Sequence, residues 1–404
     1  MTATLLLHIM ARRAKWYYFP ASMSPRPALF QSIKVGDIQL NHRVVLAPSS
    51  RFRATVDGIP NLIMVEYYAQ RARVPGTLLI AEATLIARKA GGFRHMPGIW
   101  SPKQIAAWKQ ITDAVHANGS FIFLQLLALG RTAYVEHMAP GDPFVSSSPK
   151  KVDTPFHRGA APRTDDVPRA MTTDEIKEYS GLYAIAAGNA VHKAGFDGVE
   201  VHAANGYLPE QFLWDTVNER TDEYSGSIGN RARFVLELLE AIAAVVGPTK
   251  TAIRLSPWRH WAKIDIGMTD PKPTYSFLVQ EIRDRHPDFG YIHVIEDCDV
   301  PEGSQPASTD YIREIWGKRP LISAGGYSND REGAFRVAEE KDDLIAYSRA
   351  FIANPDLPCR LLHGVPLLEG DEKKWYEPYG SSDPTGYTDY AFYDFSSVNC
   401  DGSP

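Results

Sequence analysis

The sequence is poor in cysteine, in long apolar runs and in net positive charge, and each shortage excludes a class of protein. Only three cysteines occur among 404 residues, Cys298, Cys359 and Cys400, and no two form a Cys-x-x-Cys pair. This argues against a disulfide framework, a zinc ribbon and a cysteine-held iron–sulfur cluster, and it fits a reducing compartment, for which we expect the cytoplasm. No apolar run approaches the ~20 residues needed to cross a bilayer, so we expect no membrane segment. With a net charge of −5, the chain has no basic field that would attract nucleic acid.

Acidic residues are absent from the first 36 residues, which contain five bases. The apolar stretch from Leu5 to Met10 is too short for a secretory signal, and the bases follow it instead of preceding it. We expect residues 1–27 to be a disordered or mis-annotated extension, and Met23 would make a sensible start. A mitochondrial presequence is the alternative.

The sequence does contain a repeated alternation of apolar strands and capped helices. Continuous apolar runs, typical of strands buried on both faces, occur at 44–48, 77–83, 121–127, 199–201, 251–255, 291–295, 320–324 and 344–350. Capping signals at Ser101 and Thr172 begin two of the intervening helices, and a third helix runs from Asn230 to Gly247. Eight strands alternating with helices predict an α/β fold of the closed (β/α)8, or TIM-barrel, type. An open doubly wound sheet is the alternative, but no Gly-x-Gly-x-x-Gly follows the first strand.

Three segments lie outside this alternation. Short alternating runs on either side of Gly36-Asp37 predict an N-terminal hairpin before the first strand. A long insertion, Arg131 to Ala170, follows the third strand, and Trp258 to Thr274 follows the fifth, so both can cover the C-terminal face of a barrel. We expect residues 28–378 to form the barrel and residues 379–404, rich in Gly, Ser, Asp and Tyr, to form a loosely ordered tail.

Polar side chains are most concentrated after the fourth predicted strand. The run GVEVHAANGYLPEQ, residues 198–211, places His202, Asn205 and Tyr207 within six residues, at the strand end where barrels have their chemistry. An imidazole and a carboxamide can both donate to one carbonyl oxygen, and a phenol can supply a proton. The alternative is that His202 and Asn205 satisfy a buried turn.

This run and the residues after it resemble the signature of the Old Yellow Enzyme family. After His-Ala-Ala-Asn-Gly-Tyr-Leu come Gln211, Phe212, Leu213, Asn218, Arg220, Asp222, Tyr224, Gly226, Gly229, Asn230 and Arg231. The resemblance covers residues 28–378 and implies a fungal-type, FMN-dependent ene-reductase on a (β/α)8 barrel, with non-covalent FMN reduced by NADPH. It implies that His202 and Asn205 hold the carbonyl oxygen of an α,β-unsaturated carbonyl compound. Hydride then passes from reduced FMN to the β carbon, and Tyr207 protonates the α carbon.

The cofactor-binding residues that the resemblance implies lie at the ends of several strands. They are Pro48, Ser49, Ser50, Gln125, Arg254, Gly325, Gly326, Tyr347, Ser348 and Arg349. The loops after strands seven and eight are a barrel's usual phosphate site, where glycine N–H groups and an arginine can bind phosphate. Gln125 and Arg254 are implied to face the pyrimidine edge of the flavin, and Ser50 its O4 and N5. An Arg254 held by a structural carboxylate such as Glu296 is the alternative.

Substrate contacts are implied for His202, Asn205, Phe93, Leu127, Trp261 and Tyr376. Leu127 stands where the family often has a tryptophan that narrows the pocket, so we expect room for bulkier apolar substrates. The alternative is that Leu127 packs inside the barrel and never meets substrate. We expect no metal site.

Three other functions stay open. A redox-neutral enone or enal isomerase of an alkaloid-type pathway would use the same FMN barrel, but there the tyrosine position carries phenylalanine, so Tyr207 favours net reduction. A metal-dependent barrel hydrolase would use His202, His293 and Glu296, but no His-x-His closes the first strand. A non-catalytic flavin-binding role is the third. The partners we expect are a small enone or enal and NADPH, with the protein a monomer or homodimer.

Overall fold

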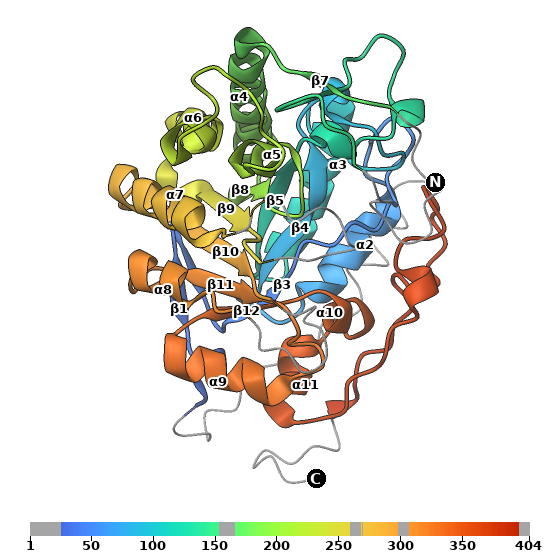
Figure 1. Ribbon diagram of the computed structural model, residues 1–404. Helices are drawn as coiled ribbons and strands as arrows, with labels where there is room; N and C mark the ends of the chain where they lie inside the picture. The colour runs from blue at the N-terminus through green and yellow to red at the C-terminus, as the bar shows by residue number, and fades with distance from the viewer. Residues whose placement is uncertain (1–25, 153–165, 259–267, 269, 298–306, 396–404) are drawn as a thin grey trace.

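Eight parallel strands close into a barrel in this computed structural model, which describes residues 26–152, 166–258, 268, 270–297 and 307–395 (Figure 1). Around the barrel they are β3 (Val44–Leu46), β4 (Leu78–Leu85), β5 (Phe121–Leu127), β8 (Gly198–Ala203), β9 (Thr251–Leu255), β10 (Tyr291–Ile295), β11 (Leu321–Ala324) and β12 (Leu344–Tyr347). The predicted (β/α)8 barrel is therefore confirmed. The eighth strand ends at Tyr347, three residues before the apolar run does, because a helix begins at Arg349.

Helices surround the barrel on its outside (Figure 1). They are α2 (Leu62–Arg71), α3 (Pro102–His116), α4 (Thr173–Gly188), α5 (Leu208–Leu213), α6 (Ile228–Val246), α7 (Lys272–Arg285), α8 (Asp310–Trp316), α9 (Arg331–Lys341), α10 (Arg349–Ala353) and α11 (Leu357–His363). Both predicted capping boxes are present: Ser101 with Gln104 at α3, and Thr172 with Glu175 at α4. Each satisfies two N–H groups that the first helical turn leaves unpaired.

Side chains alternate along each strand between the helices and the barrel interior. On β5, Ile122, Leu124 and Leu126 join the large cluster between barrel and helices, while Phe123 faces inward. Apolar side chains near the N-terminal strand ends form what we call the lower layer: Val45, Leu78, Phe123, Ala252, Tyr291, Ile322 and Leu344. Strand β8 contributes Gly198 at this level, where a Cβ would lie 2.3 Å from the ring of Phe123. Glycine is required there because the phenylalanine fills the space.

The predicted N-terminal hairpin closes the lower layer. It pairs β1 (Ile33–Val35) with β2 (Ile38–Leu40), and its inward side chains Val35 and Leu40 pack into the lower layer. Gly36 in the turn has φ +52°, and a Cβ there would lie 2.0 Å from the carbonyl oxygen of Thr249. The hairpin therefore depends on glycine for both its conformation and its close approach to the barrel.

The insertion after the third barrel strand folds against the C-terminal face. Its described part contains the short strands β6 (Val145–Ser146) and β7 (Arg169–Ala170), which pair with each other. Trp261 and most of the excursion after the fifth strand lie outside the described residues, as does nearly all of the predicted N-terminal extension.

Residues 379–395 differ from the loosely ordered tail that we expected. They run along the outside of the barrel past α2 (Figure 1), and Tyr387 is fully buried. Buried Arg51 and Arg53 donate hydrogen bonds to the carbonyl oxygens of Gly386 (2.7 Å) and Asp383 (2.7 Å). The polar composition of the tail suggested little order, but its backbone carbonyls pair with arginines that the barrel buries.

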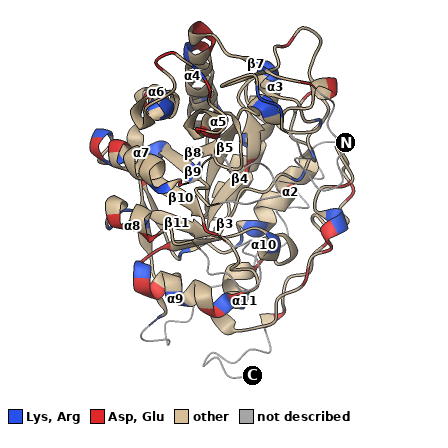
Figure 2. Ribbon diagram, viewed as in Figure 1, with Lys and Arg blue, Asp and Glu red and all other residues tan. Residues whose placement is uncertain are grey.

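Charged side chains lie mostly on the outer helices, and both signs are interspersed there (Figure 2). Among the described residues, no helix is both long and apolar enough to cross a membrane.

Candidate active site

A group of polar side chains lies inside the barrel directly above the lower layer, and we call it the polar layer. It comprises Gln125, Glu200, Arg254 and His293, on β5, β8, β9 and β10, each two residues after the lower-layer position of its strand. Nε2 of Gln125 donates to Oε1 of Glu200 (2.7 Å), and Nδ1 of His293 lies 2.9 Å from Oε2 of the same carboxylate. Glu200 is thus the centre of the polar layer.

Glu200 is fully buried, and we assign its carboxyl group as ionised. Burial alone would raise its pKa, but interactions with the ring of His293 and the guanidinium of Arg254 outweigh burial and lower the pKa. Burial lowers the pKa of His293, so we assign this ring as neutral, with Nδ1–H donating to the carboxylate. An ionised carboxylate only accepts hydrogen bonds, so the amide nitrogen of Gln125 must face Glu200. The amide oxygen of Gln125 is then left to accept from a bound molecule.

The carboxylate near Arg254 is Glu200, and not Glu296 as the structural alternative supposed. Glu296 contacts the hydroxyl of Tyr327 instead. Strand register places Arg254 beside His202 on one side and His293 on the other. Arg254 is therefore the cross-strand neighbour both of His293 in the polar layer and of His202 near the end of β8.

His202, Asn205 and Tyr207 come together at the end of β8. Nε2 of His202 lies 3.4 Å from Nδ2 of Asn205, and the rings of His202 and Tyr207 are 4.6 Å apart at 67°. His202 and Tyr207 are 3% and 7% exposed, so little water competes for them. Oδ1 of Asn205 is buried and has no hydrogen-bond partner among the described residues. Two adjacent donors and a phenol in one buried place can hold a carbonyl oxygen and supply a proton.

The predicted phosphate residues follow β11 and β12, which are neighbours in the barrel, and β3 lies next to β12. The hydroxyls of Ser49 and Ser348 are 2.6 Å apart. Gly325 and Gly326 follow β11 with φ +132° and +73°, conformations that glycine adopts without strain. Arg349 is exposed, forms no ion pair with the described residues, and lies with its guanidinium 5.1 Å from the ring centre of Trp375.

One of the predicted cofactor residues cannot contribute its side chain to the site. Tyr347 is 1% exposed and packs in the outer cluster between barrel and helices, so it can offer only its backbone to the site. Gln125 donates one N–H of its amide to Glu200, which leaves the second N–H and the amide oxygen to contact a bound molecule. Pro48 and Ser50 are half-buried at the end of β3, beside the other predicted residues.

Apolar and aromatic side chains pack around Tyr207, and we call this set the mouth cluster. Its buried members are Phe52, Ala83, Leu85, Met96, Leu127, Leu129, Ala133 and Tyr207, and Phe93 and Tyr376 pack against them. The ring of Phe52 lies 6.4 Å from that of Phe93 and 6.1 Å from that of Tyr376. Leu127 thus lies in one cluster with Tyr207, Phe93 and Tyr376. Phe52, with φ +51°, is a member that our sequence analysis missed.

Many residues of the signature stabilise the site's surroundings and do not reach it. Gln211 accepts hydrogen bonds from the N–H of Arg131 (3.1 Å) and the hydroxyl of Ser146 (2.9 Å), and it donates to the carbonyl oxygen of Gly206 (2.7 Å). These bonds fix the turn that carries Asn205 and Tyr207 against the insertion.

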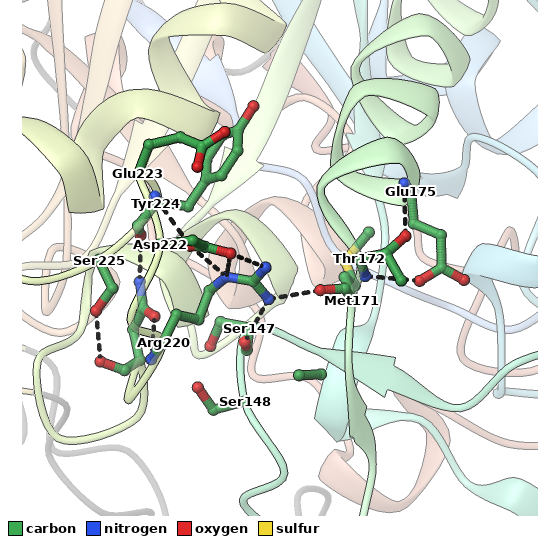
Figure 3. A network of polar contacts seen from close by, with 12 residues as sticks. Ser147, Ser148, Met171, Thr172, Glu175, Arg220, Asp222, Glu223, Tyr224 and Ser225 are labelled. Atoms are coloured by element: carbon green, nitrogen blue, oxygen red, sulfur yellow. Dashed lines mark hydrogen bonds and ion pairs between the residues drawn. The ribbon is translucent and has the colours of Figure 1, made fainter.

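Arg220 has a similar role further along the chain. It donates to the carbonyl oxygens of Ser147 (3.0 Å) and Met171 (2.6 Å) and pairs with Asp222 (Figure 3). The hydrogen bond from Arg220 lowers the pKa of Asp222. The loop after α5 is therefore joined to the residues that directly follow β6 and β7, which keeps the insertion over the C-terminal face of the barrel.

The residues fit a flavin mononucleotide in the chemistry that they offer. Hydroxyls, glycine backbone and Arg349 suit its phosphate, and Arg254 with the free amide oxygen of Gln125 suits the polar edge of its ring. The fold and these groups define a flavin-dependent oxidoreductase on a (β/α)8 barrel.

Comparison with known proteins gives the family. Residues 28–367 match the model of the NADH:flavin oxidoreductase / NADH oxidase family, and the chain belongs to this family. It is 43% identical to the NADP-dependent oxidoreductase lnbE of Aspergillus flavus, covering 91% of this chain and 96% of that one. It is 44% identical to the chanoclavine-I aldehyde reductase fgaOx3 of Penicillium roqueforti, covering 90% and 96%. Among solved structures, the Old Yellow Enzyme of Pichia sp. AKU4542 superposes with a TM-score of 0.81 at 35% identity, covering 91% of this chain and 94% of that one.

Proposed function

We propose that this protein reduces the carbon–carbon double bond of α,β-unsaturated aldehydes or ketones, with FMN as bound cofactor and NADPH as reductant. When bound, FMN supplies the hydride. The residues of this chain hold the cofactor, orient the substrate, exclude water and deliver the proton.

His202 and Asn205 hold the carbonyl oxygen of the substrate. Their side-chain nitrogens are adjacent, so both can donate to one oxygen and stabilise the enolate charge that develops there. Tyr207 lies against the ring of His202 and protonates the α carbon. Gln125 and Arg254 would hold the pyrimidine edge of the flavin, and the positive charge of Arg254 would stabilise negative charge on the reduced ring.

The observation that carries this proposal is the convergence of His202, Asn205 and Tyr207 at the C-terminal end of a barrel strand, with Tyr207 packed in the apolar mouth cluster. Tyr207 separates reduction from the redox-neutral isomerase that shares this barrel, because reduction needs a proton donor at this place. In the hydrolase reading, His293 and Glu296 would bind a metal, but they pair with Glu200 and Tyr327.

The first test is spectroscopic. The purified protein should be yellow, should lose its flavin absorption when NADPH is added without oxygen, and should regain it when 2-cyclohexenone follows. Each molecule of saturated product should consume one NADPH, whereas an isomerase would consume none. Colourless protein that takes up no added FMN would contradict the proposal.

We place the protein in the cytoplasm, where NADPH is available and its few cysteines stay reduced. We propose a monomer or homodimer, which sedimentation of the FMN-loaded protein would distinguish.

A further inference from the structure

Glu210 is a fully buried carboxylate three residues after Tyr207, in the first turn of α5. It accepts three hydrogen bonds: from the N–H of Gly206 (2.6 Å), the hydroxyl of Ser256 (2.8 Å) and the hydroxyl of Tyr275 (2.6 Å). A buried carboxylate is costly unless such donors surround it. Glu210 therefore connects the turn after β8 with the end of β9 and with α7.

The same carboxylate is also connected to the backbone of Asn205 through Ser256. The N–H of Asn205 donates to the hydroxyl of Ser256 (2.8 Å), and that hydroxyl donates to Glu210. Two consecutive N–H groups of the turn thus end on one carboxylate, one directly and one through Ser256. Asn205 has φ +59°, a left-handed conformation that an L-residue keeps only where its surroundings hold it.

The hydroxyl of Tyr275 stays protonated over the physiological pH range. Burial and the charge of Glu210 raise the pKa of Tyr275 well above its usual value, so its hydroxyl remains a donor. All of these groups are buried, with Ser256 3% and Tyr275 0% exposed. The carboxylate of Glu210 and its two hydroxyl donors are therefore shielded from water, while Asn205 itself is half-buried.

We propose that Glu210 is a positioning residue for the pair that holds the carbonyl oxygen: it fixes Asn205 in its left-handed conformation and so keeps the Asn205 amide beside His202. This inference rests on the proposed function. Three donors converge on Glu210, so an acceptor-only side chain is required. A glutamine would turn its own amino group toward one donor and leave a buried group unpaired.

Glu210→Gln tests the proposal, because it keeps the shape of the side chain and removes only its charge and one acceptor. The FMN-loaded variant should bind 4-hydroxybenzaldehyde, a phenol carrying a carbonyl, up to about 10²-fold more weakly than the wild type, the usual cost of a misplaced catalytic group. Its oxidation by 2-cyclohexenone in stopped flow should slow to a similar extent, with the FMN content unchanged. Glu210→Asp keeps an acceptor-only carboxylate and should recover part of both losses.

A double mutant distinguishes positioning from general damage. If Glu210 acts through Asn205, adding Glu210→Gln to Asn205→Ala should cause no further loss of phenol affinity, since residues acting in one network are not additive. Additive losses would overturn the proposal. The matched control is Glu237→Gln. Glu237 lies on α6, away from the site, and its carboxylate accepts a hydrogen bond from the hydroxyl of Tyr224 (2.9 Å). This variant should leave phenol affinity and enone reduction at their wild-type values.

Wild-type phenol affinity and enone rate in Glu210→Gln would also overturn the inference, while the proposed function stands. If Glu210→Gln does not fold, Ser256→Ala removes the link to Asn205 and leaves the bond to Gly206; it should weaken phenol binding in the same direction, and unchanged binding would again overturn the inference. Wild-type protein that binds FMN but reduces no enone would overturn the proposed function itself.

Discussion

The same barrel strands contribute apolar side chains to one end of the barrel interior and polar side chains to the other. On β10 the inward residue near the N-terminal end is Tyr291, in the apolar lower layer, and two residues later it is His293, in the polar layer. On β9 the same step leads from Ala252 to Arg254, and on β5 from Phe123 to Gln125.

The lower layer is closed by the hairpin and has no chemistry to perform, so apolar packing suffices. The polar layer contains a charged carboxylate shielded from water, and burying that charge requires that hydrogen-bond donors surround Glu200. We therefore expect the lower layer to determine stability, and the upper end, meaning the polar layer and the strand ends above it, to determine activity. Substitutions at each end should therefore change one property and leave the other.

Tyr207→Phe should have the largest effect. Losing a general acid typically slows the step it serves by ~10²–10⁴, equivalent to as much as about 5 kcal/mol in the barrier. Reoxidation of the reduced flavin by 2-cyclohexenone should slow in stopped flow, while reduction by NADPH keeps its rate. Loss of both half-reactions together would indicate a structural role, and an enone rate equal to that of the wild type would mean that the proton comes from elsewhere.

Phe123→Ala should have a similar energetic effect on a different property. Its ring packs against Tyr291 at 5.4 Å and fills the space beside Gly198, so truncation should cost about 3–5 kcal/mol of unfolding free energy. The midpoint of urea unfolding should fall, while enone reduction per bound FMN stays at the wild-type value. A large loss of turnover in the folded, FMN-loaded variant would contradict our expectation that the lower layer affects stability and not activity.

His202→Ala should come next in size. Removing one preorganised donor to a developing negative charge typically costs ~10²–10³ in rate. FMN should stay bound, while affinity for a phenol inhibitor falls along with the rate of enone reduction. The assignment fails if both the affinity and the rate are unchanged.

The sequence predicted the architecture well, because its signals are local. All eight apolar runs are strands, and the capping boxes at Ser101 and Thr172 begin helices, since strand and helix patterns depend on residues close together in the chain. The hairpin at Gly36 followed from the same kind of pattern.

What the sequence could not predict depends on contacts between distant residues. Glu200 is a single acid in an apolar strand, and its partners lie 75 and 93 residues away. Glu210 reaches Tyr275 over 65 residues. One signal was available: in a barrel strand, a lone polar residue two positions after an inward apolar residue also faces inward. No comparable sequence pattern predicts the packing of residues 379–395, which depends on hydrogen bonds from Arg51 and Arg53.

Leu127→Trp should have the smallest effect. It distinguishes residues of the mouth cluster that contact substrate from those that only pack. Leu127 is fully buried, in one cluster with Tyr207, Phe93 and Tyr376, so the larger indole must either narrow the substrate pocket or strain the packing. We expect the first: reduction of bulky polycyclic enones should fall relative to 2-cyclohexenone, and the preferred enantiomer from 2-substituted cyclohexenones should change, because facial choice needs only ~1–3 kcal/mol of discrimination. If the indole instead overpacks the cluster, the cost is ~1–3 kcal/mol of stability. Measuring the melting temperature beside the rate ratio for a bulky and a small enone separates the two, since a lower melting temperature with unaltered selectivity would place Leu127 in packing alone.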